Sequence, residues 1–177
     1  MGAPQLHPEI ELLLTMIDRG YDKKAWHGPN LKGSIRGLTA AQAAWRPQSK
    51  RRSIAEIVLH AAYWKYIVRR RLRGDRRGSF PLPGSNWFPV PASLTEAVWR
   101  QYVRLLEAEH TGMRAVIADL PHKQLHETPP GSKVSHLLQI TGIAAHDVYH
   151  AGQIQLLKKL TTARSRRLPR RRNGPLA

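Results

Sequence analysis

The chain has 177 residues, 41% of them hydrophobic, which is enough to bury the core of one ordinary domain. It contains no cysteine, which excludes disulfides, thiolate metal ligands and a thiol nucleophile of the protein's own. The longest apolar run, IELLLTMI, is too short to span a bilayer, and the N-terminal segment lacks the pattern of a signal peptide. We therefore expect a cytoplasmic protein with no membrane partner.

The formal net charge is +17, and much of it comes from two arginine clusters. One cluster lies at residues 69–77 and the other at residues 164–172, with six arginines in each. Such clusters attract polyanions, although solvated charge that keeps a protein in solution has the same appearance. The second cluster has almost no apolar neighbours. We expect a folded domain over residues 1–162 and a disordered basic tail over residues 163–177.

Apolar residues at helical spacing predict four long helices, and no segment shows the alternation of a strand. Ser53 with Glu56, and Ser93 with Glu96, have the spacing of a capping box at a helix start. Thr39 has the position of a cap on one additional short helix. The economical arrangement is an all-α four-helix bundle with long connections. The expected long helices span about residues 8–25, 53–74, 93–121 and 134–160.

The last predicted helix carries the stretch AAHDVYHAGQI, in which His146 and His150 are four residues apart. Side chains at this spacing lie about 5–6 Å apart on a helix, a separation that suits two imidazoles on one divalent ion. A pair of packed, hydrogen-bonded histidines fits the pattern equally well. His122 and His126 have the same spacing, but they lie in a predicted loop where the spacing is not enforced.

Both faces of this last helix are expected to be buried, as in a helix central to a bundle. The face that contains His146 and His150 also contains Gln153, which is positioned to hydrogen-bond a ligand or a bound molecule. A second line of small and apolar residues runs beside it: Val134, Leu138, Thr141, Ala145, Val148 and Gly152. Asp147 points away from the histidines, where it pairs with an arginine or orients a neighbouring group.

A third histidine is the candidate that completes a metal site. His60 lies in EIVLHAAYW on the flank of the second helix's apolar stripe, where a solvated histidine is out of place. A lone histidine in such a position is usually a satisfied core residue. Together with the pair in the last helix, it forms a set of three.

The segments SIAEIVLHAAYW and HDVYHAGQI together resemble the DinB-like superfamily, and the resemblance covers roughly residues 8 to 160. That superfamily includes bacillithiol transferases and the metal-binding domain of mycothiol-dependent maleylpyruvate isomerase. The resemblance implies a four-helix bundle that holds a divalent ion on His60, His146 and His150. Solvent or substrate then completes the coordination shell.

Three neutral ligands and an open position describe a catalytic metal site. Zinc is the expected ion, with nickel, iron and manganese as alternatives. The first hypothesis is a metal-dependent S-transferase whose low-molecular-weight thiol cosubstrate supplies the sulfur. A hydrolase that uses metal-bound hydroxide on a small-molecule substrate is its close variant. The other hypothesis is a non-catalytic bundle that binds nucleic acid or another polyanion through its basic segments. A homodimer formed through an exposed helix pair is a further expectation.

Overall fold

The computed structural model describes residues 6–48 and 51–167. Every regular element in these two ranges is helical, which confirms the predicted all-α fold class. The elements are α1 (Pro8–Tyr21), α2 (Leu31–Ile35), α3 (Ala40–Ala44), α4 (Ile54–Leu72), α5 (Glu96–Ala118), the 3-10 turn η1 (His122–Gln124) and α6 (His136–Arg167).

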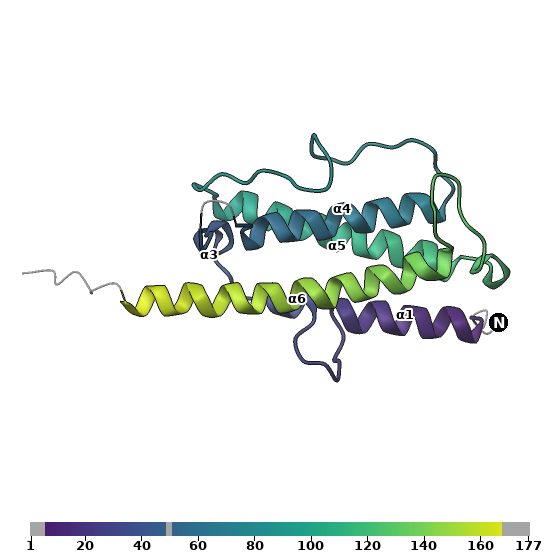
Figure 1. Cartoon of the computed structure of the whole chain (residues 1–177), viewed down its shortest axis with the longest axis horizontal. Helices are drawn as coiled ribbons and strands as arrows, with labels where there is room; N and C mark the ends of the chain where they lie inside the picture. Colours follow the sequence, from purple (N-terminus) through teal and green to yellow (C-terminus); the bar gives the residue numbers. More distant parts are fainter. Residues whose placement is uncertain (1–5, 49–50, 168–177) are drawn as a thin grey trace, which may run out of the picture.

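The four long helices α1, α4, α5 and α6 form the bundle (Figure 1). Helix α4 packs mainly against α5, and α6 packs against both α1 and α4. The short helices α2 and α3 pack against these long helices. The connection from α4 to α5 crosses the outside of the α4–α5 pair (Figure 1). None of the helices in the described ranges combines the length and the apolar character that a membrane span requires.

Side-chain caps set the starts of α3, α4 and α5. The capping box of Ser53 and Glu56 begins α4 as predicted, and Thr39 caps α3. The predicted box of Ser93 and Glu96 is wrong, because Thr95 is the residue that caps α5. The Glu96 carboxylate instead accepts a hydrogen bond from the backbone N–H of Ala40, at 2.7 Å, so one acid ties the start of α3 to α5.

Two helix ends also differ from the sequence expectation. Helix α1 ends at Tyr21, earlier than the predicted end near residue 25. Helix α6 continues to Arg167, beyond the predicted end at Leu160. Residues 168–177 of the predicted basic tail lie outside the described residues.

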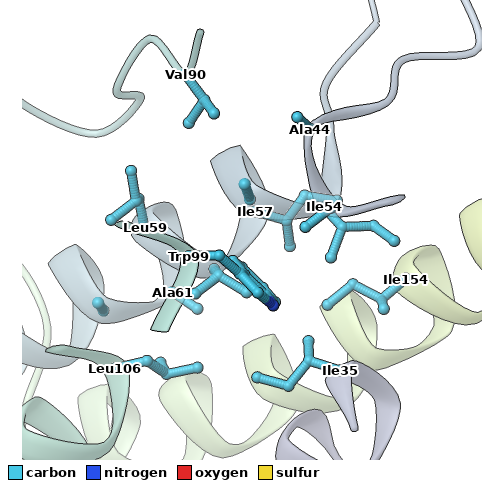
Figure 2. Packing of buried hydrophobic residues seen from close by; sticks show 14 of the residues in the cluster. Ile35, Ala44, Ile54, Ile57, Leu59, Ala61, Val90, Trp99, Leu106 and Ile154 are labelled. Atoms are coloured by element: carbon cyan, nitrogen blue, oxygen red, sulfur yellow. The ribbon is translucent and has the colours of Figure 1, made fainter. Parts of the chain in front are cut away.

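The buried apolar side chains form two clusters. The first lies where α2, α3, α4, α5 and α6 meet, and Figure 2 shows the Trp99 ring there beside Ile57, Ile35 and Ile154. The Trp99 indole N–H donates to the backbone oxygen of Leu38 at 3.0 Å, which satisfies its one polar atom. The second cluster joins α1 to the parts of α5 and α6 beside it. These two clusters hold α6 against α4 along the length that carries the histidines.

The expectation that both faces of the last helix are buried is wrong for this chain. Along the second line of residues on α6, Leu138, Ala145 and Gly152 are exposed, and Val148 is 36% exposed. The buried side of α6 is instead the one that contains Ile140, Ile143 and Ile154.

Candidate metal centre

The structure brings His60, His146 and His150 together at the interface of α4 and α6. The Nε2 atom of His146 lies 3.1 Å from Nε2 of His60 and 3.0 Å from Nε2 of His150. The three candidate ligand atoms all lie within 4.8 Å of one another. His60 and His150 are only 7% and 3% exposed, so water contributes little to their solvation.

Hydrogen bonds at the opposite ring nitrogens orient two of these imidazoles. His60 Nδ1 lies 2.8 Å from the backbone oxygen of Asn86, and His150 Nδ1 lies 2.7 Å from Oε1 of Gln153. Both partners are oxygen acceptors, so each Nδ1 carries the proton and donates it. The Nε2 atoms of both rings therefore present lone pairs, and these face Nε2 of His146. This is the tautomer that a metal-binding histidine needs.

The protein environment keeps these histidines neutral. Burial, together with the nearby His150, His60 and Lys65, lowers the pKa of His146 from 6.5 to about 3. Burial also lowers the pKa of His150 to about 4, against the raising effect of its bond to Gln153. The pKa of His60 is lowered mainly by burial. Because a proton and a metal ion compete for the same lone pair, neutral imidazoles are ready to bind a cation.

Two residues of the long α4–α5 connection complete the site, and sequence reasoning missed both. Asn86 has a positive φ of 63°, and its side-chain oxygen accepts from the Trp64 indole N–H at 3.0 Å. Trp87 stacks on the His60 ring with centroids 3.9 Å apart and planes 8° from parallel. The one available signal was the turn sequence GSN, because asparagine tolerates the left-handed conformation better than most residues.

Gln153 lies where the sequence predicts it, one turn beyond His150, whereas Asp147 has an unexpected partner. Asp147 is fully buried and forms an ion pair with Lys65 of α4, which is also fully buried. The predicted pairing with an arginine is therefore wrong. Burial raises the pKa of Asp147, and the Lys65 ammonium opposes that rise.

The remaining histidines do not join the cluster. His110 is buried in the bundle and stacks on Tyr21 with ring centroids 3.7 Å apart. His122 stacks on His7 at 3.9 Å, both on the surface of the molecule. His126 is exposed in the segment that follows η1.

A cavity of about 710 Å³ opens beside the three histidines. Its walls are mainly apolar and include Trp87, Tyr149 and Leu156. Arg51 and Arg52 are the only charged side chains among the described residues that line it. Arg52 also lies over the Trp87 ring, 4.7 Å from its centroid, and forms an ion pair with Glu56 at 3.2 Å. The cavity is suited to an apolar molecule with a negatively charged group.

The donor set fits a divalent ion, because three neutral imidazole nitrogens converge and two of the rings are oriented through their other nitrogen. A protein-family model for the DinB superfamily matches residues 25–154. The chain belongs to the DinB superfamily. This confirms the resemblance seen in the sequence, and a metal-binding role fits a member of the superfamily with such a cluster. No curated protein and no solved structure matches the chain.

Proposed function

We propose that this member of the DinB superfamily is a metal-dependent enzyme acting on a small molecule, with His60, His146 and His150 as the ligands. The observation that supports the proposal is the convergence of three neutral Nε2 atoms beside a cavity of substrate size. Three protein ligands leave a coordination position open, which is the arrangement of catalytic sites. Imidazole ligands favour zinc, and they also suit nickel, iron and manganese.

A divalent ion in this site supplies Lewis acidity, which lowers the pKa of a thiol or a water molecule bound beside it. The protein's own residues orient the imidazole rings and shield them from water. Asn86 and Gln153 hold the imidazoles of His60 and His150 in place. Trp87 covers one face of the His60 ring and keeps water from it.

The reaction that we favour is transfer of a low-molecular-weight thiol to an electrophile. The chain has no cysteine, so the sulfur arrives with a cosubstrate. Arg51 makes no ion pair with any acid in the described parts of the chain, which leaves its guanidinium available for an anionic group on the substrate. With water in place of the thiol, the same site supports hydrolysis.

The alternative of a polyanion-binding bundle has weaker support from the described residues. Part of the arginine cluster at residues 69–77 is used within the chain. Arg69 pairs with Glu109 at 2.8 Å, and Arg70 donates to the backbone oxygens of Asp75 and Arg76. These contacts stabilise the end of α4 and the start of its connection to α5.

The proposal is tested by elemental analysis of protein purified without an affinity tag or a chelator. We expect close to one divalent ion per chain in the wild type. We expect the same in the control variant His122→Ala, which replaces a histidine on the surface. We expect that ion to be lost in His60→Ala and in His146→Ala. Wild-type protein that takes up no metal after reconstitution would refute the metal site, as would a His146→Ala variant that keeps its ion.

Catalysis needs a separate test, because a metal site alone does not establish it. Metal-loaded protein is assayed with small thiols and a panel of electrophiles, with Arg51→Gln beside the wild type. We expect turnover in the wild type, and a raised KM for anionic substrates in Arg51→Gln. Turnover that is unchanged when the histidines are replaced would reject this enzymatic proposal.

A further inference from the structure

The side of α6 that faces away from the core is apolar and uncharged over most of its length. Leu138, Tyr149 and Leu156 are 57%, 63% and 60% exposed on this side. Gly142, Ala145 and Gly152 lie between them and are exposed as well. We call these six residues the α6 seam. A surface helix of a globular protein normally carries charged or polar residues on this side, and a helix that is apolar all round is normally buried.

The seam residues follow the spacing of a helix that packs on another helix. Successive members are separated by four, three, four, three and four positions, from Leu138 to Leu156. This is the alternation of a coiled-coil stripe, in which residues of one helix fit between those of a second. At about 100° per residue, the stripe lies diametrically opposite Asp147, the fully buried residue at its middle.

The seam is also symmetric about Asp147, and this property identifies the partner. Reversing the direction of the helix about that point places leucine opposite leucine, glycine opposite glycine, and alanine opposite tyrosine. The pairs are Leu138 with Leu156, Gly142 with Gly152, and Ala145 with Tyr149. A two-fold interface requires such self-complementarity, because the same patch on each copy must match itself when one copy is rotated.

The two glycines have no packing role within the chain. A Cβ atom added at Gly142 or at Gly152 meets nothing within 4 Å. Glycine in a helix interior costs roughly 1 kcal/mol relative to alanine, so a position with free space has no internal reason to use it. Close approach of a second helix supplies that reason, since small residues let two backbones come together.

The distribution of charge also favours the α6 seam as the surface where two copies meet. The chain carries +17, so two copies repel each other over most of their surfaces. Between residues 134 and 157 the sequence contains no lysine, arginine or glutamate, and its one aspartate, Asp147, is buried. Two copies can approach along this stretch without bringing like charges together.

The geometry points to a homodimer in which two α6 helices pack antiparallel along their seams, with the two-fold axis crossing the seam at the level of Asp147 along the helix. The arrangement affects the cavity, because Tyr149 and Leu156 belong both to the seam and to the cavity wall. In the dimer, the partner's Ala145 covers Tyr149, and the partner's Leu138 packs on Leu156. The second copy thus forms part of the rim of the cavity, whether or not a metal ion is bound.

The first test is molar mass in solution by light scattering and sedimentation. The wild type is expected at twice the chain mass of 20.1 kDa, and Gly142→Glu at the chain mass. Glutamate is a better helix former than glycine and has free space here, so the variant monomer keeps its fold. The matched control, Gln101→Glu on the exposed side of α5, makes the same change of charge and stays dimeric.

These masses can overturn the proposal in two ways. The added glutamate reduces the net positive charge, so electrostatics alone would favour association, and dissociation of Gly142→Glu therefore reports lost packing. A wild type that stays monomeric at the highest concentration measured refutes the dimer. A Gly142→Glu variant that stays as dimeric as Gln101→Glu refutes the α6 seam as its interface.

The second test fixes the direction of packing, and the cysteine-free chain gives it a clean background. In the double variant Gly142→Cys/Gly152→Cys, the cysteine at position 142 of one copy faces the cysteine at position 152 of the other copy across an antiparallel interface. The two are about 15 Å apart along one helix, too far for a disulfide within the chain. Mild oxidation should convert the double variant to covalent dimers and leave each single variant uncrosslinked. Crosslinking of the single variants to the same extent would indicate a parallel arrangement and overturn the proposal.

Discussion

Replacement of Lys65 by methionine should destabilise the protein far more than an ordinary lysine substitution. Lys65 and Asp147 form an ion pair between α4 and α6, and both side chains are at most 1% exposed. Methionine removes one charge and leaves the Asp147 carboxylate buried without its partner. Breaking a buried pair in this way typically costs about 3–5 kcal/mol. That is a large fraction of the roughly 5–15 kcal/mol by which a domain is stable.

The matched control is the ion pair of Lys32 with Glu107, whose side chains are 40% and 48% exposed. Water and salt screen this pair, so Lys32→Met should cost less than about 1 kcal/mol. The double variant Lys65→Met/Asp147→Leu removes both buried charges and should recover most of the loss, because a buried pair contributes little net stability over apolar residues of similar size.

Urea unfolding followed by circular dichroism gives the free energy of unfolding for each variant. The reasoning is refuted if Lys65→Met costs no more than Lys32→Met. It is also refuted if the double variant is destabilised by the sum of its two single changes, since the loss would then come from packing rather than from an unpaired charge.

Three further predictions concern the residues around the histidines. Gln153→Leu removes the acceptor for His150 Nδ1 and should weaken zinc binding about 10–100-fold in a competition titration, whereas Gln155→Leu on the same helix should not. Asn86→Ala should lower the free energy of unfolding by about 1 kcal/mol more than Asn86→Gly, because alanine is strained in the left-handed conformation that Asn86 adopts, with a φ of 63°. Equal losses in the two variants would show that this backbone conformation does not explain the use of asparagine here. Stability should fall with acid, because the pKa of His110 is about 3 in the folded protein against an ordinary 6.5. The unfolded chain takes up its proton first as the pH drops below about 6.5, so stability is complete above that pH and declines towards pH 3. In His110→Gln this decline should be smaller, and an unchanged decline in urea unfolding between pH 7 and 4 would contradict the assignment.

The parts of the site that the sequence predicts are those determined by local spacing. His146 and His150 face one direction because residues four apart share one side of a helix. Gln153 follows His150 by three residues, so it lies on the same side of the helix and its side chain reaches the His150 ring. The capping box of Ser53 and Glu56 is likewise a local pattern, and it sets where α4 begins. The placement of His60 opposite the pair needed the family resemblance, because no local rule aligns two separate helices.

The parts that the sequence does not predict depend on contacts between distant segments. Asn86 and Trp87 reach the site through a long connection whose path depends on what it packs against. Asp147 was expected beside one of many arginines, because arginine is the abundant cation of the chain. Its partner, Lys65, lies inside an apolar stripe, where a lysine usually reaches out to solvent. Only the packed helices show that both charges are buried together.

The consecutive residues 146–149 of α6 face four different directions, and this links the site to the proposed dimer. His146 faces His60, Asp147 faces Lys65, Val148 lies near Gly20 of α1, and Tyr149 is exposed in the α6 seam. A rotation of α6 by one position would move Asp147 away from Lys65 and leave a charge buried without its partner. The buried pair therefore opposes any change that turns His146 from His60, and the same constraint keeps the seam facing outward. Lys65→Met should consequently weaken metal binding and dimer formation together, although Lys65 belongs to neither surface.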